Sequence, residues 1–379
     1  MTITSLKTVS VAGTKTWNYV RLETDTGIAG TGEAHPGAGI GDLIERRLAP
    51  MLIGADARNV EPLQRRMLAS STGDSAGGML VGAIGGVETA LWDVAGKALG
   101  VPAYRLLGGA YRDRIRLYAD VGRGVAMANT PASWAARARE AAAEGFDALK
   151  FDIDHSADEL SHDLLARGLS LAELERMTAL VAAAREGAGD RVDLAIDCHG
   201  IYQVRDVLLL AERLTPFRLM FLEDPVPPEN IAALAKVTRS TPIPICTGEW
   251  RYRCDGFREL IEQQACDLLH VDVAATGGMS EAKRIADLAD LYYMPFAAHN
   301  ITSPLGLVAS AHVCAAVRNL NSMELPYHSD QVAWRWDLVR SPEPLIDRGR
   351  FVVPRGPGLG VELDETVVNA HLAPGSAPL

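Results

Sequence analysis

Hydrophobic and polar residues alternate in three short runs near the start of the chain. These runs have the pattern of strands, and they are Thr8–Val11, Asn18–Glu23 and Ala29–Ala34. Asp25–Gly27 supplies a turn between the last two, because glycine tolerates the positive φ that such a turn requires. From Asp42 to Gly100 the apolar residues take helical spacing. A sheet followed by helices predicts an α+β unit.

Beyond that unit, short apolar runs alternate with amphipathic helical stretches. Two of the helices are marked by N-terminal caps, at Thr130-Pro131 and at the capping box Ser170…Glu173. Eight apolar runs have the length of strands, and they are Ile115–Ala119, Ala148–Phe151, Val192–Ile196, Leu219–Leu222, Ile243–Cys246, Leu268–Val271, Met294–Ala298 and Asn321–Met323. Eight buried strands alternating with helices predict a closed α/β barrel. The alternative, an open doubly wound sheet, is less favoured because the GxGxxG turn is missing.

These patterns divide the chain into three parts. We expect an α+β capping domain over residues 1–115 and a barrel over residues 116–345. Residues 346–379 are rich in proline and glycine, and we expect this segment to pack back on the capping domain and complete it.

Composition narrows the class of protein. The 379 residues are 48% hydrophobic and 22% charged, which is typical of a globular protein rather than a disordered one. The net charge of −11 argues against non-specific binding to nucleic acid. No apolar run approaches the ~18 residues that a membrane span needs. Five cysteines without a CxxC pair, and a start unlike a signal peptide, indicate a reducing, cytoplasmic setting.

Chemically useful side chains follow the predicted barrel strands at intervals of one strand–helix unit. They are Lys150 and Asp152, Asp197 and His199, Glu223, Glu249, Asp272, His299, and Glu324. An isolated acid after a strand is usually a helix cap. A series in phase along successive strands is better explained by the C-terminal rim of a barrel, where catalytic groups lie.

Three of these acids, Asp197, Glu223 and Glu249, follow three consecutive strands. Carboxylates at the ends of adjacent strands lie close together, and they raise one another's pKa unless a cation lies among them. All-oxygen ligation favours a hard divalent ion, and Mg²⁺ fits best. The alternative is a carboxylate group paired with arginines.

Asp272 and His299 follow adjacent strands, where the carboxylate can hold one ring nitrogen and make the imidazole a general base. Lys150 lies between two apolar residues, so it points inward, where it adds positive charge beside a substrate. His199 lies two residues after Asp197 and therefore points the same way.

Several segments resemble the mandelate racemase subgroup of the enolase superfamily. They are Gly86–Gly109, Phe221–Pro225, Thr247–Glu249, Asp272–Gly278 and Ala298–Asn300. The resemblance implies a (β/α)₇β barrel, a TIM-like barrel, beneath an α+β capping domain, with Mg²⁺ held by Asp197, Glu223 and Glu249. It also implies shared chemistry, in which a base removes the proton α to a carboxylate and the metal stabilises the resulting enediolate.

Two departures bear on the substrate. The subgroup's second strand carries Lys-x-Lys, whereas this chain has Asp152 at the second position. Asp197–Gly200 is similar to the Asp-x-His-Gly of galactonate-type acid-sugar dehydratases. That resemblance implies that His299 takes the α-proton, that Mg²⁺ and Lys150 stabilise the enediolate, and that His199 assists loss of the β-hydroxyl. The product is then a 2-keto-3-deoxy sugar acid. Glu324 would bind the substrate carboxylate as a protonated acid.

Further substrate contacts are expected from Trp17 and His35 in capping loops, Arg251 after the last metal ligand, His328 after the last strand, and Asp152. The expected partner is a sugar acid, with no nucleic acid or membrane, in a homo-oligomer. One alternative is a racemase, epimerase or cycloisomerase of the same superfamily. An alternative of a different class is a non-catalytic protein that binds metal and ligand.

Overall fold

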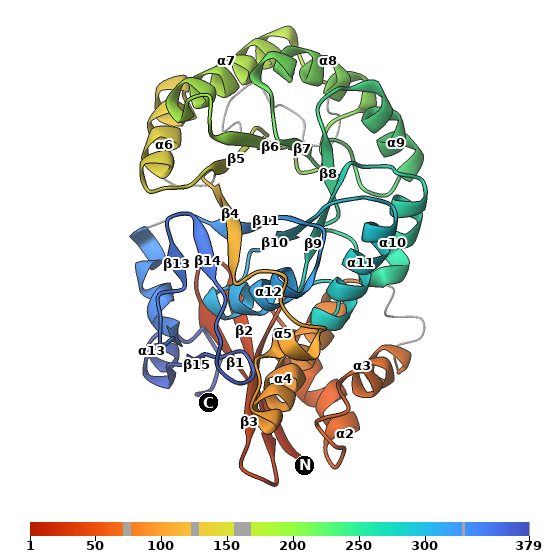
Figure 1. The fold of residues 1–379 in the computed structure, drawn as a ribbon, viewed down its shortest axis with the longest axis vertical. Coiled ribbons are helices and arrows are strands. Elements are labelled where there is room, and N and C mark those ends of the chain that lie inside the picture. The colour runs from red at the N-terminus through yellow and green to blue at the C-terminus, as the bar shows by residue number, and fades with distance from the viewer. Residues whose placement is uncertain (71–76, 123–128, 155–167, 328–329, 379) are drawn as a thin grey trace.

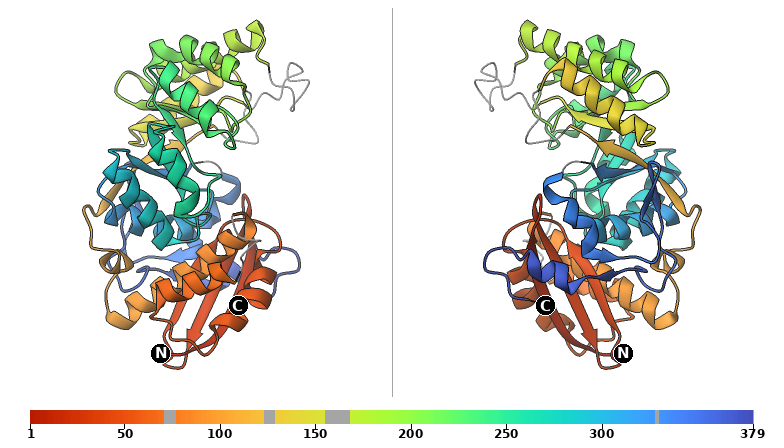
Figure 2. Two further views of the ribbon diagram at one scale, coloured as in Figure 1. Left: turned by 90° about the vertical axis from the view of Figure 1, so that its right-hand side faces the viewer. Right: turned by 90° about the vertical axis from the view of Figure 1, so that its left-hand side faces the viewer.

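The structure is a computed structural model that describes residues 1–70, 77–122, 129–154, 168–327 and 330–378. A ring of strands enclosed by helices forms the larger part of the molecule (Figure 1). The N-terminal strands and helices form a smaller unit on one side of this barrel, and the C-terminal segment lies beside them (Figure 2).

The N-terminal sheet is an antiparallel meander with the order β1-β2-β3. Its strands are β1 (Ile3–Ala12), β2 (Thr16–Thr24) and β3 (Ala29–Ala34). The three predicted strands are confirmed, and Gly27 in the connecting turn has a φ of 79°. Strand β1 begins earlier than predicted, because an irregularity in the pairing between Ile3 and Ser5 breaks the strict alternation that marks a strand.

Helices cover one face of this sheet. They are α1 (Ile40–Asp42), the π-helical segment η1 (Leu43–Leu48), α2 (Ala49–Leu52), α3 (Val60–Ala69), α4 (Met79–Leu99) and α5 (Ala103–Leu106). Helix α4 is long and apolar enough to cross a membrane by length and composition, but 94% of its most apolar stretch is buried inside the protein. It is the central helix of the capping unit's core.

In the described part of the chain, eight parallel strands form the barrel, which closes through pairing of β11 with β4. The strands are β4 (Arg114–Asp120), β5 (Ala148–Asp152), β6 (Asp193–Asp197), β7 (Phe221–Glu223), β8 (Ile245–Thr247), β9 (Leu268–Asp272), β10 (Phe296–His299) and β11 (Leu320–Pro326). Each of the eight predicted strands overlaps one of these. The predicted barrel is therefore confirmed, and the open doubly wound sheet is excluded.

A helix follows each barrel strand except the last. The helices are α6 (Pro131–Ala143), α7 (Leu171–Ala188), α8 (Val204–Leu214), α9 (Ile231–Ser240), α10 (Arg253–Glu262), α11 (Met279–Leu291) and α12 (Pro304–Ala316). Short helices η2 (Thr215–Phe217) and η3 (Asp330–Leu338) follow α8 and β11. Both predicted caps are present: the Thr130 and Ser170 side chains accept the backbone N–H of Ser133 and Glu173.

The C-terminal segment contacts both units. Its elements are β12 (Val339–Arg340), β13 (Ile346–Asp347), β14 (Arg350–Val352), β15 (Glu362–Leu363) and α13 (Glu365–Ala370). Strand β14 pairs with the start of β4 in the barrel. Further along, the Ala12 N–H donates to the His371 carbonyl and the Ala373 N–H donates to the Ser10 carbonyl. This end of the chain therefore continues the packing of the N-terminal sheet.

Close packing of α4 on β3 depends on glycine. A Cβ on Gly86 would lie 2.6 Å from the backbone nitrogen of Ala34, and one on Gly32 would lie 2.1 Å from the Gly86 carbonyl oxygen. We predict that Gly86→Ala lowers the free energy of unfolding by about 1–3 kcal/mol, because the backbones must separate. Gly256→Ala in α10 is the control. A Cβ added at Gly256 would meet no neighbouring atom within 4 Å outside its own helix backbone, and alanine forms helices better than glycine. If calorimetry gave Gly86→Ala the same thermal midpoint as wild type, the prediction would be wrong.

Candidate functional site

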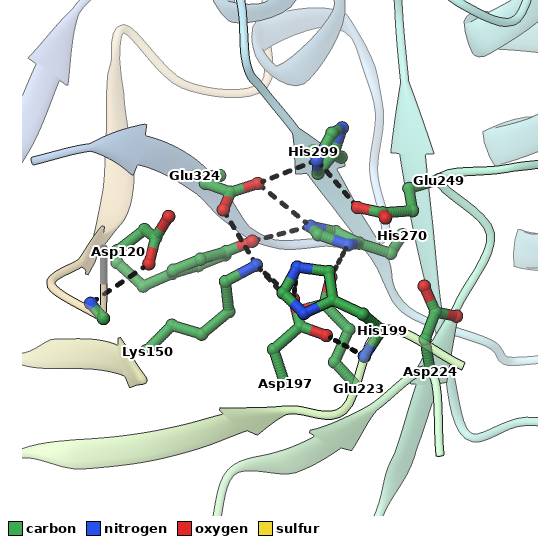
Figure 3. Close-up of polar contacts among 12 residues, drawn as sticks. Asp120, Lys150, Asp197, His199, Glu223, Asp224, Glu249, His270, His299 and Glu324 are labelled. Atoms are coloured by element: carbon green, nitrogen blue, oxygen red, sulfur yellow. Dashed lines mark hydrogen bonds and ion pairs between the residues drawn. The ribbon is translucent and has the colours of Figure 1, made fainter. Parts of the chain in front are cut away.

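A cavity of about 290 Å³ lies at the C-terminal rim of the barrel, between the strand ends and the capping unit. Residues from six barrel strands or the loops after them reach it, together with two side chains of the capping unit. Figure 3 shows the polar contacts among the residues at the barrel rim. The lining residues are Lys15, His35, Asp120, Lys150, Asp152, Asp197, His199, Glu249, Trp250, Tyr252, His299, Ile301 and Glu324. The structure thus brings most of the predicted strand-end residues to one place.

Lys150 on β5 is the centre of a buried ion cluster. Its Nζ lies 3.0 Å from Asp197 Oδ2, 3.1 Å from Glu223 Oε2 and 2.8 Å from Glu324 Oε1. Burial lowers the pKa of Lys150, but the three carboxylates outweigh it and raise that pKa well above its usual value. Lys150 therefore points into the barrel, as its apolar neighbours predicted, and carries a positive charge.

The three carboxylates predicted to bind metal are buried at the same rim. Backbone pairing sets Asp197 beside Glu223, and Lys150 bridges their side chains. Oxygen atoms of Glu223 and Glu249 and a ring nitrogen of His270 all lie within 4.8 Å of one another. Asp197 forms a neighbouring group of the same kind with Asp152 and His199.

This donor set fits a hard divalent cation. Burial and the nearby charges of Asp197, Glu324 and Glu249 raise the pKa of Glu223 well above its usual value, although Lys150 lowers it. Glu223 Oε1 is buried and has no hydrogen bond of acceptable geometry among the described residues. A cation among these oxygens would relieve the repulsion and give Glu223 Oε1 a partner of opposite charge.

His299 on β10 lies between two carboxylates. Its Nδ1 is 2.8 Å from Asp272 Oδ2 on β9, and its Nε2 is 2.8 Å from Glu249 Oε2. Burial lowers the pKa of His299, but Glu249, Glu324 and Asp272 raise it well above its usual value. The contact with Asp272 fixes the ring, so that Nε2 faces the metal carboxylates and the cavity.

His199 has an orienting carboxylate of its own. Its Nδ1 lies 2.9 Å from Asp154 Oδ1, and its backbone N–H donates to Asp197 Oδ1. Its φ of 45° is uncommon for a residue with a side chain, and it aims the ring at the cavity. Burial lowers the pKa of His199, but the contact with Asp154 and the charges of Asp197 and Asp152 raise it to about 9.

Glu324 contacts a backbone amide and Lys150. Its Oε2 accepts the backbone N–H of Asn300, and its Oε1 lies 2.8 Å from Lys150 Nζ. Burial raises the pKa of Glu324, but Lys150, His299 and His270 outweigh it and lower that pKa to about 2. The proton that Glu324 is expected to carry when it binds the substrate carboxylate stays a prediction.

Sequence reasoning missed a buried pair beneath the rim. Tyr118 on β4 and His270 on β9 share a hydrogen bond of 2.6 Å between the hydroxyl and Nε2. His270 Nδ1 lies 2.7 Å from Glu223 Oε1. Burial lowers the pKa of His270 to about 3, so the ring is neutral. His270 stands two positions before Asp272, so the rule that placed Lys150 inward would also have found it.

The remaining predicted contacts divide into three groups. Asp152 and His35 line the cavity. Trp17 and Arg251 are not among the described residues that line it, contrary to the prediction: Trp17 packs on Trp334 with ring centroids 6.0 Å apart, and Arg251 donates to backbone carbonyls. Trp17 is on a strand and fills the core instead. His328 lies outside the described residues.

Other lining residues had no prediction. Asp120 is the last residue of β4, so the rule that residues at the ends of barrel strands lie at the rim would have predicted it too. Lys15, Trp250, Tyr252 and Ile301 lie in loops or beside helix starts, where no periodic pattern reveals which way a side chain points.

Two family models match most of the chain. Residues 3–108 match the N-terminal domain of mandelate racemase / muconate lactonizing enzyme, and residues 133–367 match the enolase C-terminal domain-like model. A solved structure of a mandelate racemase/muconate lactonizing enzyme-like protein from Rubrobacter xylanophilus is 42% identical, with a TM-score of 0.93, and the match covers 99% of this chain and 98% of that one. The 3,6-anhydro-D-galactonate cycloisomerase of Zobellia galactanivorans is 27% identical, with a TM-score of 0.86, over 98% of this chain and 100% of that one.

Relatives with named activities match over nearly the full length. The D-xylonate dehydratase of Haloferax volcanii is 42% identical over 374 residues, which cover 98% of this chain and 89% of that protein. The D-galactonate dehydratase of Ralstonia nicotianae is 33% identical over 358 residues, 93% of this chain and 90% of that protein. Fold, rim chemistry and these matches agree: the chain belongs to the mandelate racemase / muconate lactonizing enzyme family of the enolase superfamily.

Proposed function

We propose that this protein is a lyase, a Mg²⁺-dependent acid-sugar dehydratase that converts an aldonic acid to its 2-keto-3-deoxy derivative. One observation carries the proposal: His299 and His199, each held at Nδ1 by its own aspartate, line the same small cavity beside a cluster of metal-type carboxylates. A racemase needs only proton transfer at one carbon, whereas elimination also needs an acid for the leaving hydroxyl. The names of the relatives support the same reaction class.

Asp197, Glu223 and Glu249 would hold the cation, because their oxygens are buried together and carry more negative charge than Lys150 alone compensates. A bound Mg²⁺ would act as a Lewis acid that draws electrons from the substrate carboxylate and lowers the pKa of the proton at C2. Lys150 keeps a positive charge at the same end of the cavity.

His299 is the proposed base. Asp272 holds Nδ1, which leaves Nε2 to take the proton from C2 of the substrate. In the structure that nitrogen contacts Glu249. When Glu249 serves as a metal ligand, it no longer competes for the ring, and Nε2 is available to the substrate.

His199 is the proposed acid. With Asp154 on Nδ1, its Nε2 can give a proton to the hydroxyl at C3. Removal of the C2 proton leaves its electron pair delocalised into the carboxylate as an enediolate, which the charge of Lys150 stabilises. In a second step that pair forms the C2–C3 double bond as the C3–O bond breaks and water leaves. The enol at C2 then becomes the ketone as C3 takes up a proton. No oxidant or reductant is required, because the reaction is an internal redox exchange between adjacent carbons.

The substrate class follows from the site and the relatives together. The cavity is small, most of its lining residues are charged or polar, and Lys15 and His35 of the capping unit are among them. Hydroxyl groups of a short sugar acid are suitable partners for both. D-Xylonate is the first candidate, since the Haloferax relative named for it is 42% identical.

We predict that the Mg²⁺-loaded protein converts D-xylonate to a 2-keto-3-deoxy acid. The measurement is ¹H NMR in D₂O, with D-galactonate and pooled aldonic and aldaric acids as further samples. Loss of the C2 proton signal together with new 3-deoxy signals is the expected result. Deuterium at C2 without a keto product would indicate a racemase or epimerase instead. Mg²⁺ binding with no change in any acid would favour a non-catalytic binding protein.

Substitution of the two histidines is expected to affect C2 exchange and dehydration differently. His299→Asn removes the base, so C2 exchange and dehydration should both fall by about 10²–10⁴-fold. His199→Asn should slow dehydration by a similar factor while C2 exchange continues, because the base and metal ligands remain. Exchange and product formation are measured in the same NMR sample. Equal loss of exchange in both variants would contradict the assignment of His199.

Metal binding has a readout that needs no substrate. We predict that Mg²⁺ raises the thermal midpoint of chelator-treated protein. A free Mg²⁺ concentration of 100 times its Kd corresponds to about 2.7 kcal/mol of stabilisation. Asp197→Asn should abolish that rise. The matched control is Asp193→Asn at the other end of β6, where the side chain pairs with Arg116. The same Mg²⁺ response in Asp197→Asn and wild type would overturn the assignment of this ligand.

A further inference from the structure

Two barrel helices receive their N-terminal hydrogen bonds from the capping unit. Glu88, fully buried on α4, accepts the backbone N–H of Met279 at 2.8 Å and that of Ser280 at 3.0 Å. The Ser280 hydroxyl and the Trp92 indole also donate to it. These amides begin α11, so Glu88 is the cap of a helix that belongs to the other unit.

Glu33, at the end of β3, does the same for α12. It accepts the Ser303 N–H at 2.8 Å, the Ser303 hydroxyl at 2.5 Å and the Gly306 N–H at 2.8 Å. Its exposed fraction is 2%. The first amides of a helix lack partners within the helix, and its N-terminus favours negative charge, so a buried carboxylate is well suited to both needs.

At α11 the preceding barrel residue offers no alternative to Glu88. The residue that precedes α11 is Gly278, which has no side chain to cap the helix. A Cβ at Gly278 would lie 2.2 Å from Glu88 Oε2, so the glycine is what allows the carboxylate to approach. Burial raises the pKa of Glu88 to about 7, and hydrogen bonds from Ser280, Trp92 and Met279 oppose that rise.

The two capped helices follow the two strands that carry the His–Asp pair. Helix α11 follows β9, which ends at Asp272, and the link is a tight turn in which Asp272 Oδ1 accepts the Ala275 N–H at 2.7 Å. Helix α12 follows β10, which ends at His299. The neighbouring Asn300 is tied to α12, because its Oδ1 accepts the Ser310 hydroxyl. Movement at the start of either helix is therefore passed to the pair.

We propose that Glu88 and Glu33 are positioning residues, which hold the starts of α11 and α12 and so fix Asp272 and His299 relative to each other and to the capping unit. They touch neither the cavity nor the metal carboxylates in the described contacts. The kinetic part of this inference rests on the proposed function, since it takes His299 as the base. The structural part does not.

Asp93 provides a matched control within the same core. It is a third buried carboxylate of α4, with an exposed fraction of 1%. It accepts the N–H of Thr31 at 2.9 Å and of Leu359 at 2.8 Å, and it pairs with Lys97 at 2.8 Å. Its loss should destabilise the protein about as much as loss of Glu88 or Glu33, but Asp93 accepts no N–H of the first turn of α11 or α12 in the described contacts.

The test compares Glu33→Gln, Glu88→Gln and Asp93→Asn in the full chain. The measurements are the thermal midpoint, kcat and KM, hydrogen–deuterium exchange of the first turns of α11 and α12, and the low-field ¹H signal of the His299 Nδ1 proton, assigned by its absence in His299→Asn. Ser280→Ala removes one donor to Glu88 and serves as a milder variant if Glu88→Gln does not fold.

We expect all three variants to lose thermal stability. Glu33→Gln and Glu88→Gln should also exchange faster in α12 and α11 respectively, broaden or shift the Nδ1 signal, and lose about 10- to 100-fold in kcat, because small misplacements of a catalytic group are costly. Their KM should change by less than about threefold, and kcat of Asp93→Asn should stay within about twofold of wild type.

Two results would overturn the proposal. One is a fall in kcat that is proportional to the decrease in thermal midpoint in all three variants, Asp93→Asn included. A purely structural role would produce that result. The other is faster exchange in α11 and α12 with an unchanged Nδ1 signal. If the wild type turns over no acid sugar, the proposed function fails by itself, while the exchange and Nδ1 measurements still decide the positioning role.

Discussion

Compensation of buried negative charge is the constraint on which this molecule depends. The barrel rim concentrates carboxylates from successive strands, and each ionised group that leaves water must find a partner. Lys150 contacts Asp197, Glu223 and Glu324, and His299 contacts Asp272 and Glu249. His199 contacts Asp154 and Asp197. These three basic side chains are fewer than the carboxylates around them among the described residues, and this imbalance favours a divalent cation at the rim.

The same principle joins the two units. Glu33 and Glu88 are buried at the interface and are satisfied by the free amides of α12 and α11 rather than by cations. The interface therefore uses helix ends as the partners of buried acids, and the helices it stabilises are those next to the His–Asp pair. Stability of the interface and geometry of the site have a common physical origin.

The sequence predicted the site where one rule applies repeatedly. Parallel barrel strands end at the same rim, so Lys150, Asp197, His199 and His299 could be brought together by counting. It failed for Trp17, which lies on β2 instead of in a loop and packs on the distant Trp334. It also failed for Arg251, whose side chain is held by the backbone carbonyls of Pro228 and Gly256.

By itself, the sequence determined the order of strands and helices, the closed barrel and the identity of the rim residues, because these follow from local periodicity and from one repeated spacing. Tertiary structure alone decided which charges neutralise one another, that Asp154 and His270 belong to the site, and that capping-unit acids hold barrel helices. Such properties arise because groups far apart in the chain come together in the buried, low-dielectric interior. There each group changes the free energy of ionisation of the other, and no local sequence pattern indicates which groups will be in contact.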